Sequence, residues 1–216
     1  MEDRRLQGWS AAAGILGPLL LGAYFGAPAL AAWPYAGASP DALVAYARSH
    51  AILFYAGGWL QATGALLSIA FFVALTHLSG RRDELAAVAV YVGGATLLAV
   101  VLVEAALLEA VPMAAANGDR ITVATTFALS NGVFARIFPL APAPLVFAGI
   151  GFALRGTNLL PGPLVTAALV IAALFVVSGI AAIFGTAGLV LAIVMSIVEA
   201  IWILASGVTL AARAWR

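Results

Sequence analysis

Six long apolar stretches constrain this chain more than any other feature of its sequence. Each is at least 25 residues long and contains no more than two charged residues. They cover residues 9–33, 50–78, 85–113, 121–154, 160–184 and 186–213. Because an α-helix needs about 20 apolar residues to cross the hydrocarbon layer of a bilayer, each stretch can span a membrane. The sequence therefore predicts an all-α transmembrane bundle of six helices, forming a single domain over residues 1–216.

The composition supports a membrane setting. Of the 216 residues, 64% are hydrophobic and 9% are charged, whereas soluble domains have about 45–50% apolar and about 25% charged residues. So few charges cannot cover the surface of a water-soluble protein of this size, so the lipid bilayer is the expected partner. The net charge of +1 gives the chain no excess of positive charge with which to bind nucleic acid.

The arginines predict the orientation of the bundle. An even number of spans places both termini on one side, and that side would carry seven of the ten arginines: Arg4, Arg5, Arg81, Arg82, Arg155, Arg213 and Arg216. The opposite loops carry only Arg48 and Arg120. Loops rich in arginine usually face the cytoplasm, so we expect both termini to be cytoplasmic, in a multi-pass protein of the plasma membrane.

Two segments depart from plain spans. The stretch 121–154 is longer than one crossing needs and contains Pro139, Pro142 and Pro144. Two short helices would fit its length, but a seventh span would place Arg155 outside. We therefore predict one crossing that is kinked at the prolines, with residues 121–130 at the outer interface. A serine before Pro40 and Asp41 is typical of a helix start, which predicts a short interfacial helix over 40–48.

A third local pattern concerns helix packing. Gly22 and Gly26 are separated by three residues, the small-xxx-small spacing that brings membrane helices into close contact. The spacing predicts a helix–helix contact at this point of the first span, although such matches are common in a chain with 22 glycines.

Four strongly polar residues lie deep inside the apolar stretches, where they are costly and often functional, while Glu109 and Asn131 lie near an interface. The four are Gln61, Glu104, Arg136 and Glu199. Counting about 1.5 Å per residue from the inner end of each span places Glu104 and Arg136 at nearly the same height in the outer half. Gln61 comes out slightly deeper and Glu199 near the midplane. We predict a Glu104–Arg136 ion pair lining a polar pocket open to the outside, with Gln61 and Glu199 as its walls or floor.

Three interpretations of this pocket stay open. The first is a site that binds or transports a small or lipophilic molecule, with Glu199 as the possible proton carrier, since burial favours the neutral form of a carboxyl group. The second is a structural or accessory subunit, in which the ion pair only fixes the helices and the function belongs to other membrane subunits or a homo-oligomer. The third is an intramembrane enzyme.

Several chemistries are not expected from this sequence. Cysteine and lysine are absent, and the four aspartates fall in tails or loops. His50 and His77 are 27 residues apart on one predicted helix, about 40 Å, so they cannot share a metal or haem. We therefore predict no catalytic residues, no cofactor and no metal site. His50 could act as a surface base with a nearby serine, but a lone histidine is more often a polar helix end.

Two segments also carry a resemblance to known proteins. They are GGWLQATGALLSIAFFVAL at 57–75 and APLVFAGIGFALRG at 143–156, the latter followed by LLP at 159–161. Together they resemble a family of bacterial polytopic membrane proteins that is named only as a domain of unknown function. The resemblance implies a six- or seven-helix fold in a bacterial inner membrane and implies no activity.

Overall fold

The computed structural model describes residues 2–30, 32–34, 37–81, 84–184 and 187–214. Within these ranges the chain is helical and contains no strand. The α-helices are α1 (Glu2–Leu30), α2 (Pro40–Ser49), α3 (Ala51–Leu78), α4 (Leu85–Ala116), α5 (Arg120–Gly132), α6 (Phe138–Leu140), α7 (Pro142–Leu154), α8 (Gly162–Ala181) and α9 (Ala187–Ala214). A π-helical segment, Val133–Ile137, joins α5 to α6, and a 3₁₀ turn, Ala182–Phe184, ends α8.

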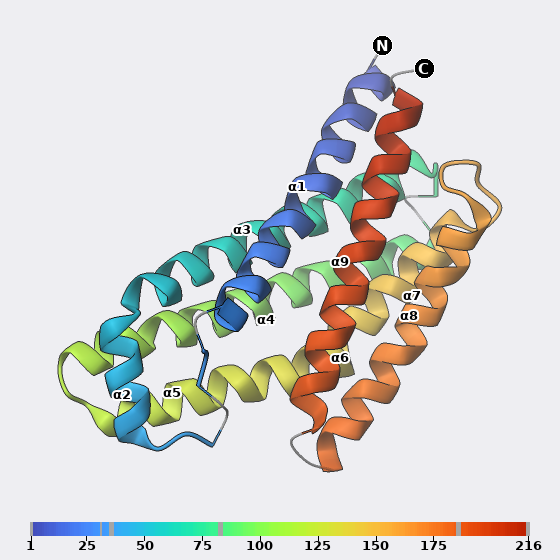
Figure 1. Ribbon diagram of the computed structural model, residues 1–216. Helices are drawn as coiled ribbons and strands as arrows, with labels where there is room; N and C mark the ends of the chain where they lie inside the picture. Colours follow the sequence, from blue (N-terminus) through green and yellow to red (C-terminus); the bar gives the residue numbers. More distant parts are fainter. Residues whose placement is uncertain (1, 31, 35–36, 82–83, 185–186, 215–216) are drawn as a thin grey trace.

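Six helical segments are long and apolar enough to cross a membrane. Four lie within α1, α3, α4 and α9, the fifth (Gly162–Phe184) comprises α8 and the 3₁₀ turn, and the sixth is the interrupted segment Arg120–Leu154. The predicted all-α bundle of six spans is confirmed, and the chain is a multi-pass integral membrane protein. Both termini lie at one end of the bundle (Figure 1). We call this the inner end and the opposite one the outer end, after the predicted orientation. Arg82 and Arg216, used in that prediction, lie outside the described residues.

The outer end is closed by the short helix α2. Ser39 caps it by accepting a hydrogen bond from the Ala42 amide at 3.3 Å, so the structure forms the helix predicted over 40–48. Arg48 Nε donates to the carbonyl of Ala115 at 2.7 Å, in the last turn of α4. An ion pair between Asp41 and Arg120 ties α2 to the start of α5. Beneath these contacts lies a small apolar core, formed by Leu43, Ala47, Phe54, Leu108, Val111, Ala115, Val123 and Phe127.

The start of α5 supplies a pH-dependent contact. Asp119 Oδ2 accepts from the Thr122 hydroxyl at 2.5 Å and Oδ1 from the Thr122 amide at 3.0 Å. These hydrogen bonds, the hydroxyl one first, lower the pKa of Asp119 below its ordinary value. A lowered pKa means that this cap stabilises the fold above the unfolded-state value of about 3.9 and is lost as the pH falls through the folded-state value.

We expect Asp119→Ala to loosen the first turn of α5 at pH 7, because two hydrogen bonds are lost. Amide hydrogen exchange at Thr122 and Val123 should become several-fold faster. Asp119→Ser, which can still cap the helix, should restore most of the protection. Equal exchange in the alanine variant and the unmodified protein at pH 7 would contradict this role.

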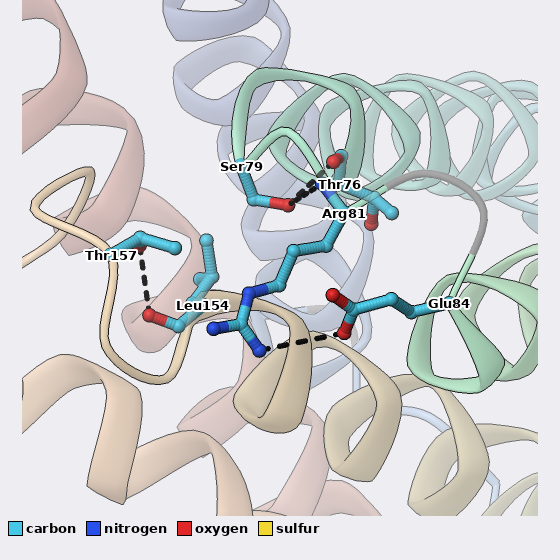
Figure 2. Close-up of polar contacts among 6 residues, drawn as sticks. All are labelled: Thr76, Ser79, Arg81, Glu84, Leu154 and Thr157. Carbon is cyan, nitrogen blue, oxygen red and sulfur yellow. Dashed lines mark hydrogen bonds and ion pairs between the residues drawn. The ribbon is translucent and has the colours of Figure 1, made fainter.

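Figure 2 shows how the inner end is held together. Ser79 Oγ donates to the Thr76 carbonyl at 2.7 Å and accepts from the Arg81 amide at 3.2 Å, which shapes the turn between α3 and α4. The Arg81 side chain extends from this turn toward Leu154 and forms an ion pair with Glu84 at 3.4 Å. These contacts lie far from the polar groups in the spans and have a structural role.

Helices α1 and α3 cross where two glycines meet. A Cβ atom on Gly64 would lie 2.9 Å from the carbonyl oxygen of Gly17, and a Cβ on Gly17 would lie 2.9 Å from that of Gly64. A Cβ at Gly22 or Gly26 would meet no atom of another helix within 4 Å among the residues that the structure describes. The predicted packing contact at Gly22 and Gly26 is therefore wrong. The face of α1 that carries Gly17 makes the contact instead, and spacing alone cannot identify that face.

The fourth span is broken rather than smoothly kinked. The π-helical segment follows α5, and Ala141, with φ −129° and ψ −58°, interrupts the helix before Pro142 opens α7. Among the contacts of the fourth span with α4, two mark defined levels, one between Val146 and Gly93 and one between Ser130 and Glu104. Along α4 the two levels are eleven residues apart, from Gly93 to Glu104. Along the fourth span they are sixteen residues apart, from Ser130 to Val146.

The five additional residues carry the fourth span away from α4 and toward α8. At the far point of this detour the backbone of Leu140 packs on α8, where a Cβ on Gly179 would lie 2.8 Å from the Leu140 Cα. Prolines favour such a detour because they remove backbone donors and clash with the preceding turn. The detour determines where Arg136 lies.

Candidate functional site

Glu104 is the centre of a buried polar cluster. Its side chain is 4% exposed. Gln61 Nε2 of α3 donates to Oε2, and Ser130 Oγ of α5 donates to Oε1 at 2.7 Å. The hydroxyl of Tyr24, on α1, also interacts with this carboxylate. Four helices thus converge on one carboxylate, and their donors hold it in a fixed orientation.

A small cavity, here called the polar chamber, lies beside this cluster. It has a volume of about 40 Å³ and is enclosed by residues of α1, α3, α4, α6, α9 and the π-helical segment. Its polar lining residues are Gln61, Ser68, Glu104, Ser196 and Glu199, and the rest of its lining is apolar. Since a water molecule needs about 10–15 Å³ of such volume, the chamber has room for a few waters or one small polar group.

Glu199 lies in the wall of the polar chamber contributed by α9. It is 6% exposed, and it makes no hydrogen bond or ion pair with any residue that the structure describes. The Oε1 atom of Gln61 is likewise buried and has no hydrogen-bond partner. An unpartnered carboxylate and an unpartnered amide oxygen therefore share one chamber, and buried polar groups of this kind normally have partners.

A larger cavity, here called the outer pocket, adjoins the chamber. Its volume is about 610 Å³, and it lies among α1, the segment at Trp33, α5 and the outer turns of α9. Aromatic side chains dominate its lining: Tyr24, Phe25, Trp33, Phe127 and Phe134.

The two cavities meet at Glu104. Phe25, Glu104 and Phe134 line both of them. The rings of Phe25 and Phe134 are 5.7 Å apart between centroids, so they pack against each other at this shared boundary. A molecule that passes from the outer pocket into the polar chamber must therefore displace these two rings, beside the Glu104 carboxylate.

The structure brings together three of the four predicted site residues. Gln61, Glu104 and Glu199 all line the polar chamber. Arg136 does not, because its side chain is exposed on the outside of the bundle and its Nε lies 3.5 Å from the carbonyl of Ala182. The predicted Glu104–Arg136 ion pair is not formed. The reason is the detour of the fourth span, which places Ser130 opposite Glu104 and turns Arg136 toward the end of α8.

We expect Arg136→Gln to leave the melting temperature of the detergent-solubilised protein nearly unchanged, because the guanidinium group has one long contact to a carbonyl. Breaking a buried ion pair would instead cost about 3–5 kcal/mol. A thermal unfolding measurement on the purified variant distinguishes the two cases. A large loss of stability, restored by a charge swap with Glu104, would support the ion pair and contradict the observed geometry.

Two site residues were missed by the sequence prediction. Ser130 and Tyr24 contact Glu104, yet serine and tyrosine are common in membrane helices and carry no charge that marks them. The neighbouring Asn131 lines the outer pocket and donates its amide to the Phe127 carbonyl at 2.9 Å. The adjacent polar residues 130–131 are the only sequence signal that could have indicated that α5 lines the outer pocket.

The histidine considered as a surface base lies at the end of α2. His50 Nδ1 is 2.8 Å from Ser49 Oγ and 3.1 Å from the carbonyl of Tyr46. The Ser49 hydroxyl also lies 3.0 Å from the carbonyls of Ala45 and Tyr46. Hydrogen bonds to backbone carbonyls fit a helix end better than an activated nucleophile.

Comparisons of this chain with family models, with curated proteins and with solved structures found no match. The resemblance noted from the sequence therefore stays a prediction. The function has to be argued from the cavities and the residues that line them.

Proposed function

We propose that this membrane protein binds, and in a further step transports, a small molecule that enters from the outer end. The observation that carries the proposal is the junction of the outer pocket with the polar chamber at Glu104. The ligand would lie mainly in the outer pocket and place its polar part at Glu104. In the predicted orientation, the outer end faces the outside of a bacterial inner membrane.

The dimensions and lining of the outer pocket support binding. Its volume of about 610 Å³ falls in the range of about 300–1,000 Å³ that is usual for small-molecule sites. Such sites are mostly apolar, with a few fixed polar groups that orient the ligand. Glu104 is a polar group of this kind, because donors from α3 and α5 hold it in place.

The polar chamber extends the route inward. Both α3 and α9 run from the outer to the inner end, so Ser68 lies two turns further in than Gln61, and Glu199 nearly one turn further in than Ser196. Glu199 is therefore the deepest carboxylate of the route and the proposed proton carrier. Ionisable residues in such positions commonly mark substrate or proton pathways.

An aromatic cluster closes the chamber on its inner side. Phe72 follows Ser68 by one helical turn, and Trp202 follows Glu199 by three residues. The rings of Phe72 and Trp202 are 6.0 Å apart, and Phe147 of α7 packs edge-on against both at 5.4 Å. All three side chains are buried. Transport would require this cluster to open, so the proposed cycle includes a state that is closed toward the inner end.

The absence of cysteine from the sequence allows a direct test of the route. Single-cysteine variants Ser130→Cys and Ser196→Cys place a thiol at the junction and in the chamber, and Ser178→Cys places one in the buried core of α8 as a control. With cells treated by methyl methanethiosulfonate, a small neutral reagent, we expect the first two to react at least ten-fold faster than the control. A Ser196→Cys variant as slow as the control would contradict the route.

A further inference from the structure

The polar chamber presents hydrogen-bond acceptors and has no free donor among the described residues that line it. Gln61, in the wall of the chamber, uses its amide nitrogen on Glu104, which leaves Oε1 buried without a partner. Ser68 Oγ donates to the Gly64 carbonyl at 2.8 Å, and Ser196 Oγ donates to the Ala192 carbonyl at 2.9 Å. Each hydroxyl can therefore only accept a further hydrogen bond from an occupant.

The charged side chains around the chamber also favour an occupant that donates hydrogen bonds. Glu104 and Glu199 are the ionisable side chains in its described lining, and both are acidic. The described lining of the outer pocket contains no arginine or histidine either. Arg136, the nearest basic residue along the fourth span, points away from both cavities. An occupant with positive charge and N–H donors would complement these groups, and an anion would find no basic side chain in the described lining.

The aromatic lining of the outer pocket favours a ligand with an apolar, organic part. Aromatic faces attract cations and also pack against apolar groups. Phe25 and Phe134 pack against each other where the two cavities meet, and Trp33 and Phe127, with ring centroids 6.2 Å apart, line the wider space beyond them. A bare metal ion would gain little from such a lining.

We propose that the ligand is an amphipathic organic cation, a protonated amine whose ammonium group enters the polar chamber and whose apolar body fills the outer pocket. The assignment rests on the proposed function and adds its substrate class. In this arrangement the ammonium hydrogens bond Gln61 Oε1 and the two carboxylates. The aromatic rings enclose the carbon skeleton.

The first experiment measures thermal stabilisation of the purified protein by four probes. These are 2-phenylethylammonium, the neutral 2-phenylethanol, the anionic 3-phenylpropanoate and sodium chloride. We expect the ammonium probe to raise the melting temperature with half of the effect at a concentration at least ten-fold below that of the alcohol, and the anionic probe and sodium chloride to have no such effect. Glu199→Gln should remove this advantage, because Glu199 faces the chamber without a partner.

A matched control variant is Glu109→Gln. Glu109 is a half-buried carboxylate on the same helix as Glu104, and it lines neither cavity. It should retain the response to the ammonium probe. Equal stabilisation by the alcohol, or stabilisation by sodium that depends equally on Glu199, would overturn the amine assignment.

The second experiment separates the substrate class from the route. The Ser196→Cys variant is treated with methanethiosulfonates that carry either a trimethylammonium or a sulfonate group, and Ser49→Cys, on the surface of α2, corrects for their intrinsic reactivity. We expect at least a ten-fold preference for the cationic reagent, reduced several-fold by Glu199→Gln. Reaction with the neutral reagent but no charge preference would refute the amine assignment and leave the route standing. No reaction with any reagent would refute both.

Discussion

Glu104→Gln should destabilise the protein strongly although the two side chains have nearly the same shape. In the unmodified protein, Glu104 accepts hydrogen bonds from Gln61 and Ser130. A glutamine at 104 would present an amide group with two N–H donors. Either these meet the donors of Gln61, or the Gln61 amide flips to accept from them, and in both cases the buried Gln61 amide nitrogen loses its acceptor. A buried donor that loses its acceptor costs about 1–3 kcal/mol. We expect a loss of that size in thermal or chemical unfolding, with less folded protein recovered from the membrane.

Exchanging the donor and the acceptor between residues 61 and 104 tests whether their hydrogen bond causes this loss of stability. In the double variant Gln61→Glu with Glu104→Gln, the amide of residue 104 can donate to the carboxylate of residue 61, while its oxygen still accepts from Ser130. We expect at least half of the lost stability to return. Glu109→Gln, which removes a charge from the same helix, should have little effect. A double variant no more stable than the single one would show that the hydrogen bond is not what stabilises these helices.

Gly149→Val should cause the largest loss of folded protein among the packing variants. A Cβ atom at this position would lie 2.8 Å from the Ala86 carbonyl oxygen and 2.9 Å from the Val90 amide nitrogen. Both are backbone atoms of α4, so no side-chain rotation can make room, and α7 has to move away from α4. Overpacking of this kind costs about 1–3 kcal/mol or more. Size-exclusion chromatography of a fluorescent fusion measures the yield of folded protein.

The control for this variant is Gly22→Val. An added Cβ at Gly22 would contact no atom of another helix within 4 Å in the described part of the chain, although the residue belongs to the small-xxx-small match in the first span. We expect a yield close to that of the unmodified protein. If Gly22→Val were as harmful as Gly149→Val, the loss would reflect valine in a membrane helix rather than the crossing of α4 and α7.

Three of the chamber residues could be identified from the sequence because of a simple energetic argument. Gln61, Glu104 and Glu199 are too polar to face lipid, so each had to face the interior of the bundle. The same argument was wrong for Arg136, which lies on the outside near the end of α8. A long arginine side chain can reach polar groups or water from the edge of a span, so its presence in an apolar stretch does not prove burial.

The partners of Glu104 could not be predicted for a geometric reason. Counting residues from the inner end assumes a straight helix with a rise of about 1.5 Å per residue. The π-helical segment Val133–Ile137 and the break at Ala141 violate that assumption. As a result Ser130 lies where a regular helix would place a residue several positions later in the chain.

The sequence by itself determined the number of spans, that all of them are helical, the polar start of α2 and the burial of three polar side chains. These properties depend on local composition and on the cost of placing polar groups in lipid, and both can be summed along the chain. Only the tertiary structure decided which faces of the helices meet, that Ser130 and Tyr24 complete the cluster at Glu104, and that an aromatic pocket opens onto it. Those features depend on small displacements where the fourth span is interrupted, and such displacements follow from the packing of several helices at once.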